Sequence, residues 1–279
     1  MKTFIMSLLI MIKKYFNLIN NRITKYDKRM RIVVGSLLMV AVMLIATFYF
    51  FDKAWIFIPT FLLVTYVVTW FTISEGIRKV EWIMLFIMPL LFTIAIYFFY
   101  FLFPVRWLTR FPFVVFYGLS LYAILLSSNI FNVGVKTNLQ LYRAAFSVNY
   151  FYQIFTIFLI INVILSLQLS FIINGVLVSI LSIVMLLHLL WTVKLDLAIE
   201  KEIWFYCIVM GLVMGELAIL LSFIPMRAAI SALLISATYY SLAGLIYSYY
   251  NQRYFKEIIR EYIFVIIFVI LIGFLSLKW

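Results

Sequence analysis

The sequence predicts an all-α protein, a polytopic bundle of about nine transmembrane helices with a cytoplasmic N-terminus, and three observations support this fold class. First, 67% of the 279 residues are hydrophobic and only 11% are charged, whereas a soluble domain carries about 25% charged residues. Second, apolar runs of about 20 residues, the length that crosses a bilayer as a helix, recur along the chain. Third, the basic residues collect on alternate sides of these runs.

The apolar runs define nine predicted spans. They cover residues 32–51, 54–73, 82–103, 111–135, 144–167, 171–193, 203–224, 228–250 and 262–278. Seventeen of the 22 Lys and Arg residues fall on one side of these spans and five on the other. A missed or invented span would disturb the alternation, so we expect the N-terminus inside and the C-terminus outside a cell membrane, either plasma or bacterial inner membrane.

Residues 1–31 form a basic segment, separate from the transmembrane domain of residues 32–279. This segment holds eight Lys or Arg residues and one acid, and its apolar part, residues 4–12, is too short to span. Apolar residues recur at helical spacing: Phe4, Leu8, Ile12, Phe16 and Ile19. We expect an amphipathic helix on the cytoplasmic leaflet, in contact with anionic lipid head groups. The alternative is an unstructured basic leader that only sets topology.

The net charge of +12 does not indicate nucleic-acid binding, because the basic residues are spread over short loops and the N-terminal segment. The single cysteine, Cys207, excludes an intrachain disulfide. The sequence contains no P-loop, HExxH or GxSxG motif and no metal-ligand spacing. It therefore predicts no cofactor and no metal site, and it offers no positive support for an enzyme.

Glu216 is the one acid deep inside an apolar run, roughly 20 Å from the cytoplasmic end of its span at 1.5 Å per residue. An unpaired carboxylate there is costly, so we expect Glu216 to be protonated or to hold a cation. Neighbouring spans offer polar residues at the same depth, of which Ser179, Ser236, Thr238 and Tyr239 are the candidate partners. The alternatives are a structural hydrogen bond between helices and an acid that is paired only in a complex.

Small residues form a stripe on the span that carries Glu216: Gly211, Gly215, Ala218 and Ser222. Such stripes allow helices to approach closely in lipid. The next span carries small residues at similar spacing, and a short turn around Pro225 joins the two. The sequence therefore predicts a tight antiparallel hairpin of residues 203–224 and 228–250. It shows no internal repeat.

Amide side chains occur in two further spans. Asn149 and Gln153 share one helical face, and Asn129 and Asn132 lie at the end of the preceding span. These amides either form hydrogen bonds between helices or line a path for a polar substrate. His188 and Cys207 lie at similar depth, where a catalytic pair is the less favoured interpretation and packing the more favoured one.

The segment from Asn129 to Val133, followed by residues 139–145 (LQLYRAA), resembles a segment of uncharacterised multi-pass membrane proteins of candidate-phylum bacteria. The resemblance covers fewer than twenty residues. It implies a bacterial inner-membrane setting and no activity.

These observations favour a transporter or permease that uses Glu216 as an intramembrane proton or cation site. A second hypothesis is a non-catalytic membrane subunit or scaffold of a cell-envelope complex, which would meet membrane-protein partners or a second copy of the chain. An intramembrane enzyme is the third.

Overall fold

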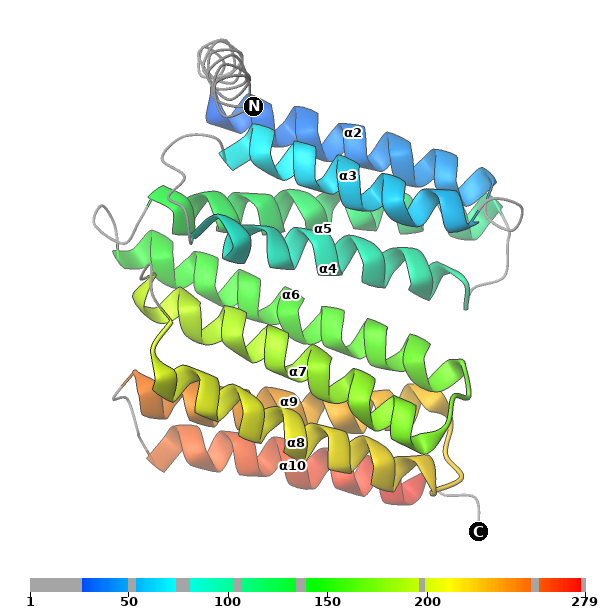
Figure 1. Ribbon diagram of the computed structural model, residues 1–279, viewed down its shortest axis with the longest axis vertical. Coiled ribbons are helices and arrows are strands. Elements are labelled where there is room, and N and C mark those ends of the chain that lie inside the picture. The colour runs from blue at the N-terminus through cyan, green and yellow to red at the C-terminus, as the bar shows by residue number, and fades with distance from the viewer. Residues whose placement is uncertain are drawn as a thin grey trace, which may run out of the picture.

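The computed structural model describes residues 27–49, 54–73, 81–102, 107–133, 139–195, 199–251 and 256–276, and these ranges are helical almost throughout. They contain nine helices, and no strand occurs among them (Figure 1). The helices are α2 (Lys28–Phe48), α3 (Ala54–Ile73), α4 (Glu81–Tyr100), α5 (Trp107–Val133), α6 (Leu139–Ser166), α7 (Phe171–Lys194), α8 (Lys201–Ser222), α9 (Ala228–Tyr250) and α10 (Lys256–Leu275).

Eight of these helices, α2 to α9, are long and apolar enough to cross a membrane. The prediction of an all-α, multi-pass membrane protein is thereby confirmed. Each helix corresponds to one predicted span. Several begin a turn or more earlier than predicted, because charged first turns, such as that of α10 with Lys256 and Glu257, continue the helix beyond its apolar part. Of the predicted basic amphipathic segment, residues 1–31, residues 1–26 lie outside the described residues, and the last four residues form the first turn of α2.

Of the nine helices in the described residues, α2 to α9 form two consecutive four-helix bundles, and α10 packs on α9 (Figure 1). In the first, α2, α3, α4 and α5 each pack against the next helix, and α5 closes the ring on α2. In the second, α6, α7, α8 and α9 repeat this order, and α9 closes on α6. Even the weaker diagonal contact recurs, between α3 and α5 and between α7 and α9.

The two bundles share the order in which neighbouring helices pack, but their joins differ. Besides α5, α4 also packs on α6, whereas among the described residues no comparable contact joins α8 to α10. The expectation that the chain has no internal repeat stays a prediction.

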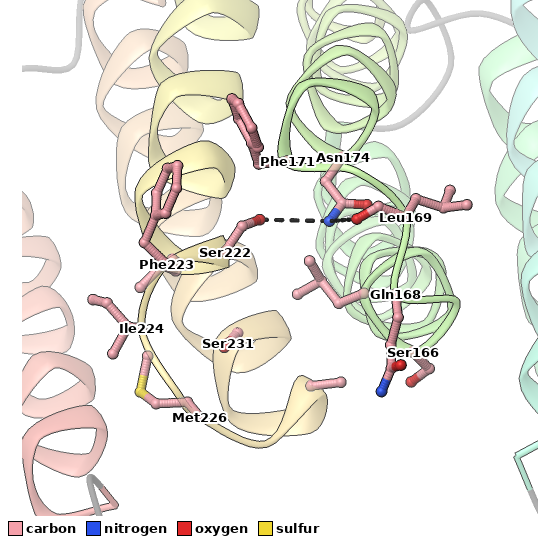
Figure 2. Close-up of a pocket in the computed structure, with 13 residues that line it drawn as sticks. Ser166, Gln168, Leu169, Phe171, Asn174, Ser222, Phe223, Ile224, Met226 and Ser231 are labelled. Atoms are coloured by element: carbon pink, nitrogen blue, oxygen red, sulfur yellow. Dashed lines mark hydrogen bonds between the residues drawn. The ribbon is translucent and has the colours of Figure 1, made fainter.

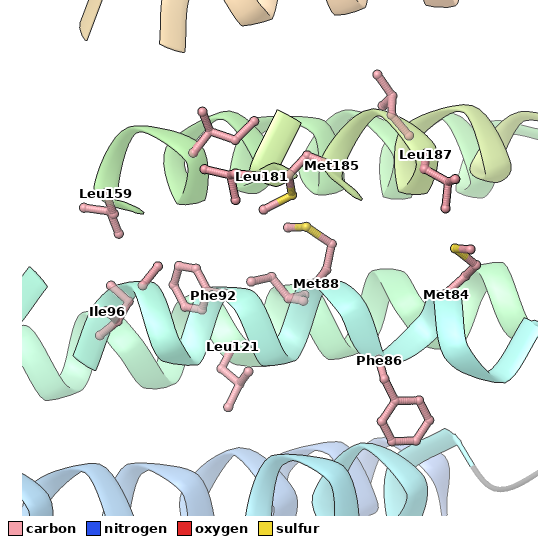
Figure 3. Packing of buried hydrophobic residues seen from close by; sticks show 14 of the residues in the cluster. Met84, Phe86, Met88, Phe92, Ile96, Leu121, Leu159, Leu181, Met185 and Leu187 are labelled. Atoms are coloured by element: carbon pink, nitrogen blue, oxygen red, sulfur yellow. The ribbon is translucent and has the colours of Figure 1, made fainter. Parts of the chain in front are cut away.

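The seam between the bundles is a packed apolar core. Met84, Met88, Phe92 and Ile96 of α4 face residues of α6 and α7, among them Met185, in Figure 3. All are buried. The unbranched methionines suit this seam because they fill the irregular gaps between two separately closed bundles.

The closest helix pair is α7 with α8, which corrects the predicted tight hairpin of α8 with α9. The backbone of Gly215 lies against Ser179 and Gly175, and the backbone of Gly211 lies against Ile183. Contacts between α8 and α9 are far fewer. The stripe of small residues on α8 therefore serves close approach, as the sequence indicates, but its partner is the preceding helix. The short turn between α8 and α9 joins these helices along the chain, but it does not determine which helix packs against the stripe.

Candidate functional site: a buried polar ladder in the second bundle

Glu216 lies on the exposed face of α8. Within the part of the chain that the structure describes, no hydrogen bond or ion pair involves its carboxyl group. The neighbours on this face are apolar, with Leu212 59% exposed and Leu220 62% exposed. Because Gly211 and Gly215 turn toward α7, the next residue in the helix points outward.

The four predicted partners of Glu216 form hydrogen bonds or contacts with other groups. Ser236 donates a hydrogen bond to the Leu233 carbonyl at 3.1 Å, and Thr238 donates to the Leu234 carbonyl at 2.8 Å. Tyr239 is fully buried and its hydroxyl oxygen accepts a hydrogen bond from Gln153 Nε2 at 3.2 Å. Ser179 contacts the backbone of Gly215. The structure therefore does not gather these four residues around Glu216, and the role of Glu216 as an ion site stays a prediction.

Buried polar side chains of the second bundle lie instead in a row on α6, α7 and α9. Its centre is Gln153, whose Nε2 donates to the Met185 carbonyl of α7 as well as to Tyr239 of α9. The side chain of Gln153 is fully buried. One glutamine therefore ties three helices together inside the bundle.

The register of α6 against α7 places further polar groups above and below Gln153. Tyr142 of α6 donates to the Thr192 carbonyl of α7, and Gln153 donates to the Met185 carbonyl, so the helices run antiparallel. On this register Asn149 lies near the level of His188, and Thr156 lies near the level of Ser182. We call these six residues the polar ladder: Asn149, Gln153, Thr156, Ser182, His188 and Tyr239.

Several atoms of the ladder are buried without a hydrogen-bond partner among the described residues. They are Asn149 Nδ2 and Oδ1, Gln153 Oε1, Ser182 Oγ and His188 Nδ1. All four side chains are at most 2% exposed. A buried polar group without a partner costs roughly 1–3 kcal/mol, so this row is expensive to maintain for packing alone. Buried polar groups of this kind call for an explanation, and a bound water molecule or another polar ligand is one that fits.

Asn149 and Gln153 were predicted from the sequence as a possible polar path, but Ser182 and His188 of α7 were not predicted to be part of it. Ser182 and Met185 are three residues apart on α7, as are Met185 and His188, so each pair lies side by side on the helix surface. The spacing was visible in the sequence. What was missing was the knowledge that this surface meets α6.

The other two amides of the predicted path lie elsewhere. Asn132 Nδ2 donates to the Ile73 carbonyl at 2.9 Å, and Asn129, one turn earlier, is half-buried. Ile73 is the last residue of α3, where backbone carbonyls lack helical partners. Asn132 therefore caps a helix of the first bundle and is not joined to Asn149 or Gln153 by any hydrogen bond that the described residues make.

The capping role leads to a prediction. Asn132→Ala is expected to lower the free energy of unfolding by about 1 kcal/mol, because the Ile73 carbonyl loses its donor. The measurement is the unfolding midpoint in a denaturing-detergent titration. Asn129→Ala is the matched control and should leave the midpoint unchanged. Equal effects of the two substitutions would contradict the capping role.

A cavity of about 570 Å³ lies at one end of the second bundle, between the α6–α7 and α8–α9 turns (Figure 2). Asn174 is 5% exposed and lies in its wall. Its Nδ2 donates to the Leu169 carbonyl and to Ser222 Oγ, both at 3.4 Å. Ser222 in turn donates to the Ala218 carbonyl at 2.8 Å, so the donors and acceptors determine the orientation of the amide. Along α7, the cavity is about 12 Å from Ser182, eight residues away.

His188 and Cys207 are both buried, and the His188 ring lies 6.2 Å from the ring of Trp191. No hydrogen bond joins His188 to Cys207 in the described ranges. No three His, Cys, Asp or Glu side chains gather there in a way that would hold a metal ion. Both residues are embedded in helix packing.

Comparison of the chain with protein families, with curated proteins and with solved structures finds no match. The resemblance of residues 129–145 to bacterial membrane proteins therefore stays a prediction. What the protein does must be inferred from its own geometry.

Proposed function

We propose that the protein is a transporter or permease whose polar path follows the ladder through the second bundle. The observation that carries this proposal is the row of buried amide, hydroxyl and imidazole atoms on α6, α7 and α9 that have no hydrogen-bond partner among the described residues. A bundle that needed only to pack would gain stability by replacing a residue such as Asn149, neither of whose amide atoms has a partner among the described residues, with an apolar side chain. The cavity beside Asn174 supplies an opening at one end of the same bundle.

The chemistry of the ladder favours an uncharged solute. Its side chains are amides, hydroxyls, a phenol and one imidazole, and it contains no carboxylate, lysine or arginine. These groups exchange hydrogen bonds with a neutral polar molecule at little cost, whereas a bare ion in the same place would lack a counter-charge. We therefore infer a small neutral molecule rich in hydrogen-bonding groups as the substrate class.

We further infer that α10 is a ninth span and that the N-terminal side is cytoplasmic. The support is the seventeen-to-five distribution of basic residues and the apolar face of α10, where Phe264 is 68% exposed. The basic segment of residues 1–31 would then meet anionic head groups of the cytoplasmic leaflet.

The test is solute entry into proteoliposomes, followed by light scattering as the vesicles swell in glycerol or in urea. Vesicles that contain the protein should swell faster than protein-free vesicles with at least one of these probes. Asn149→Leu and Gln153→Leu should each lower the added rate at least about tenfold, because each replaces a hydrogen-bonding group in the path.

Two controls make the result specific. Asn129→Leu replaces an amide outside the ladder and should keep the flux, and Glu216→Gln should keep it as well. Swelling at the protein-free rate with both probes would contradict a path for neutral solutes. Loss of flux in Glu216→Gln with normal flux in Asn149→Leu would indicate that Glu216, and not the polar ladder, is the transport site.

A second candidate function is a non-catalytic subunit of a membrane assembly. The exposed position of Glu216 favours it, because intramembrane acids usually face other protein or a water-filled cavity. Purification in mild detergent separates the two. Unrelated chains in stoichiometric amounts support the subunit, and a particle of one chain type supports the transporter.

A further inference from the structure

The cavity between the α6–α7 and α8–α9 turns is lined by the ends of four helices (Figure 2). Two helices end there, α6 at Ser166 and α8 at Ser222, and two begin there, α7 at Phe171 and α9 at Ala228. Its volume of about 570 Å³ lies within the range of small-molecule sites, roughly 300–1,000 Å³. The cavity therefore has room for a ligand larger than a single water molecule.

Two nearly buried polar side chains in the wall have unused hydrogen-bonding capacity. Asn174 is 5% exposed, and its Nδ2 already donates to the Leu169 carbonyl and to Ser222 Oγ. Its Oδ1 has no hydrogen-bond partner among the described residues. Ser231 is also 5% exposed, and its hydroxyl forms no hydrogen bond within the described ranges. The amide thus leaves an acceptor unused, and the serine leaves both a donor and an acceptor unused.

The two helix starts add hydrogen-bond donors to the wall. The first backbone N–H groups of a helix have no partner inside the helix. Neither α7 nor α9 has a side chain that caps its start. Because the first residue of each helix, Phe171 or Ala228, lines the cavity, these N–H groups lie at its border. The wall therefore combines backbone donors with amide and hydroxyl acceptors.

The charge of the wall narrows the class of ligand. Among the described residues that line the cavity, none is charged. A cation would meet the positive ends of two helix dipoles with no carboxylate to balance it. An anion without a proton to donate would leave Asn174 Oδ1 unpaired. A hydroxyl group satisfies both kinds of wall group, because it donates one hydrogen bond and accepts others.

We propose that this cavity is a binding site for a polyol, a molecule or head group with several adjacent hydroxyl groups. One hydroxyl donates to Asn174 Oδ1, and its neighbours exchange hydrogen bonds with Ser231 and with the first N–H groups of the helix starts. The same chemistry is present in a free sugar alcohol and in the glycerol head group of a phospholipid. The site goes beyond the proposed transport function, because it rests on the cavity wall and not on the polar ladder.

The test is protection of an engineered thiol in phosphatidylcholine vesicles. In a Cys207→Ser background, Ala228→Cys places a thiol in the wall, and its labelling by a methanethiosulfonate reagent is timed with and without sorbitol. Labelling should slow saturably, by about tenfold when sorbitol exceeds its dissociation constant tenfold. Ala229→Cys, exposed in the same first turn but outside the wall, is the matched control and should label at an unchanged rate. Glycine betaine at equal osmolality has no hydrogen-bond donor and should not protect.

The wall residues are tested in the same assay. Ser231→Ala should weaken the affinity for sorbitol about tenfold, because the ligand loses one hydrogen-bond partner. Ser248→Ala is the control, since Ser248 is also 5% exposed on α9 but donates to the Gly244 carbonyl and does not line the cavity. Asn174→Leu should abolish protection. Thermal unfolding verifies that each variant is folded, and Ser231→Ala decides the result if Asn174→Leu is not.

Lipid composition distinguishes the two sources of hydroxyl groups. Protection by sorbitol in phosphatidylcholine vesicles assigns the site to a free polyol. Protection without sorbitol in vesicles that contain phosphatidylglycerol, and not in those that contain phosphatidic acid, assigns it to a glycerol head group. Either result supports the proposal. Asn149→Leu should leave the protection unchanged, so that failure of the transport path and failure of this site are separate results.

Three outcomes would overturn the proposal. The first is an unchanged labelling rate of Ala228→Cys under all of these conditions. The second is equal slowing at Ala229→Cys or by glycine betaine, which would indicate a general effect of the solution. The third is an unchanged affinity for the polyol in folded Ser231→Ala.

Discussion

Replacement of Gly215 by alanine is expected to destabilise the protein by about 2 kcal/mol, although alanine is the better helix former. A Cβ atom at this position would lie 2.0 Å from Ser179 Oγ and 2.9 Å from the Gly175 carbonyl oxygen. The serine hydroxyl can rotate away, but the carbonyl belongs to the backbone of α7. The two helices must therefore separate, and neighbouring contacts of the α7–α8 interface would be lost with them.

The measurement is the free energy of unfolding in mixed micelles, with Gly273→Ala as the matched control. At Gly273 the nearest atom to a new Cβ is the flexible Leu234 Cδ1 at 2.9 Å, so this substitution should be tolerated. Ser179→Gly combined with Gly215→Ala should recover part of the loss, as a double-mutant cycle would show. Equal effects at Gly215 and Gly273 would contradict close backbone contact between α7 and α8.

Replacement of Asn149 by leucine is expected to have the opposite sign, a gain of about 1 kcal/mol. Both polar atoms of the Asn149 amide are buried without a partner among the described residues, so removing them relieves a desolvation cost. Gln153→Leu should instead lose about 1 kcal/mol, because the Met185 carbonyl and the Tyr239 hydroxyl lose their donor.

The same unfolding assay compares the two variants. Together with loss of solute flux, a gain of stability in Asn149→Leu would identify a residue that is kept for function at a cost in stability. Destabilisation of both variants by similar amounts would show that Asn149 has a structural partner, and the ladder would lose its principal functional residue.

The sequence alone determined the class of the protein and the position of its helices. Runs of about 20 apolar residues have one stable form in a bilayer, because each backbone N–H and C=O must be satisfied within its own segment. Local sequence therefore suffices to predict a helix such as α8, and the small residues Gly211 and Gly215 suffice to predict that one face of it packs closely.

The tertiary structure decided which helices meet. Apolar helices in lipid gain no hydrophobic energy from one partner over another, so side-chain fit selects the neighbour. The short turn at Pro225 and the small residues of α9 suggested α9 as the partner of the Gly215 stripe, whereas fit against Ser179 and Gly175 selects α7. Because the stripe faces α7, Glu216 points outward, and the Tyr239 hydroxyl accepts a hydrogen bond from Gln153.

The candidate site follows the same division. Asn149 and Gln153 were recognisable as a polar face because they lie four residues apart on one helix. Their union with Ser182 and His188 depends on the antiparallel register of α6 and α7, and that register is set by contacts between residues more than thirty positions apart, such as Gln153 with Met185. Periodicity along one helix is a local property, but the pairing of two polar faces is decided only when the whole bundle packs.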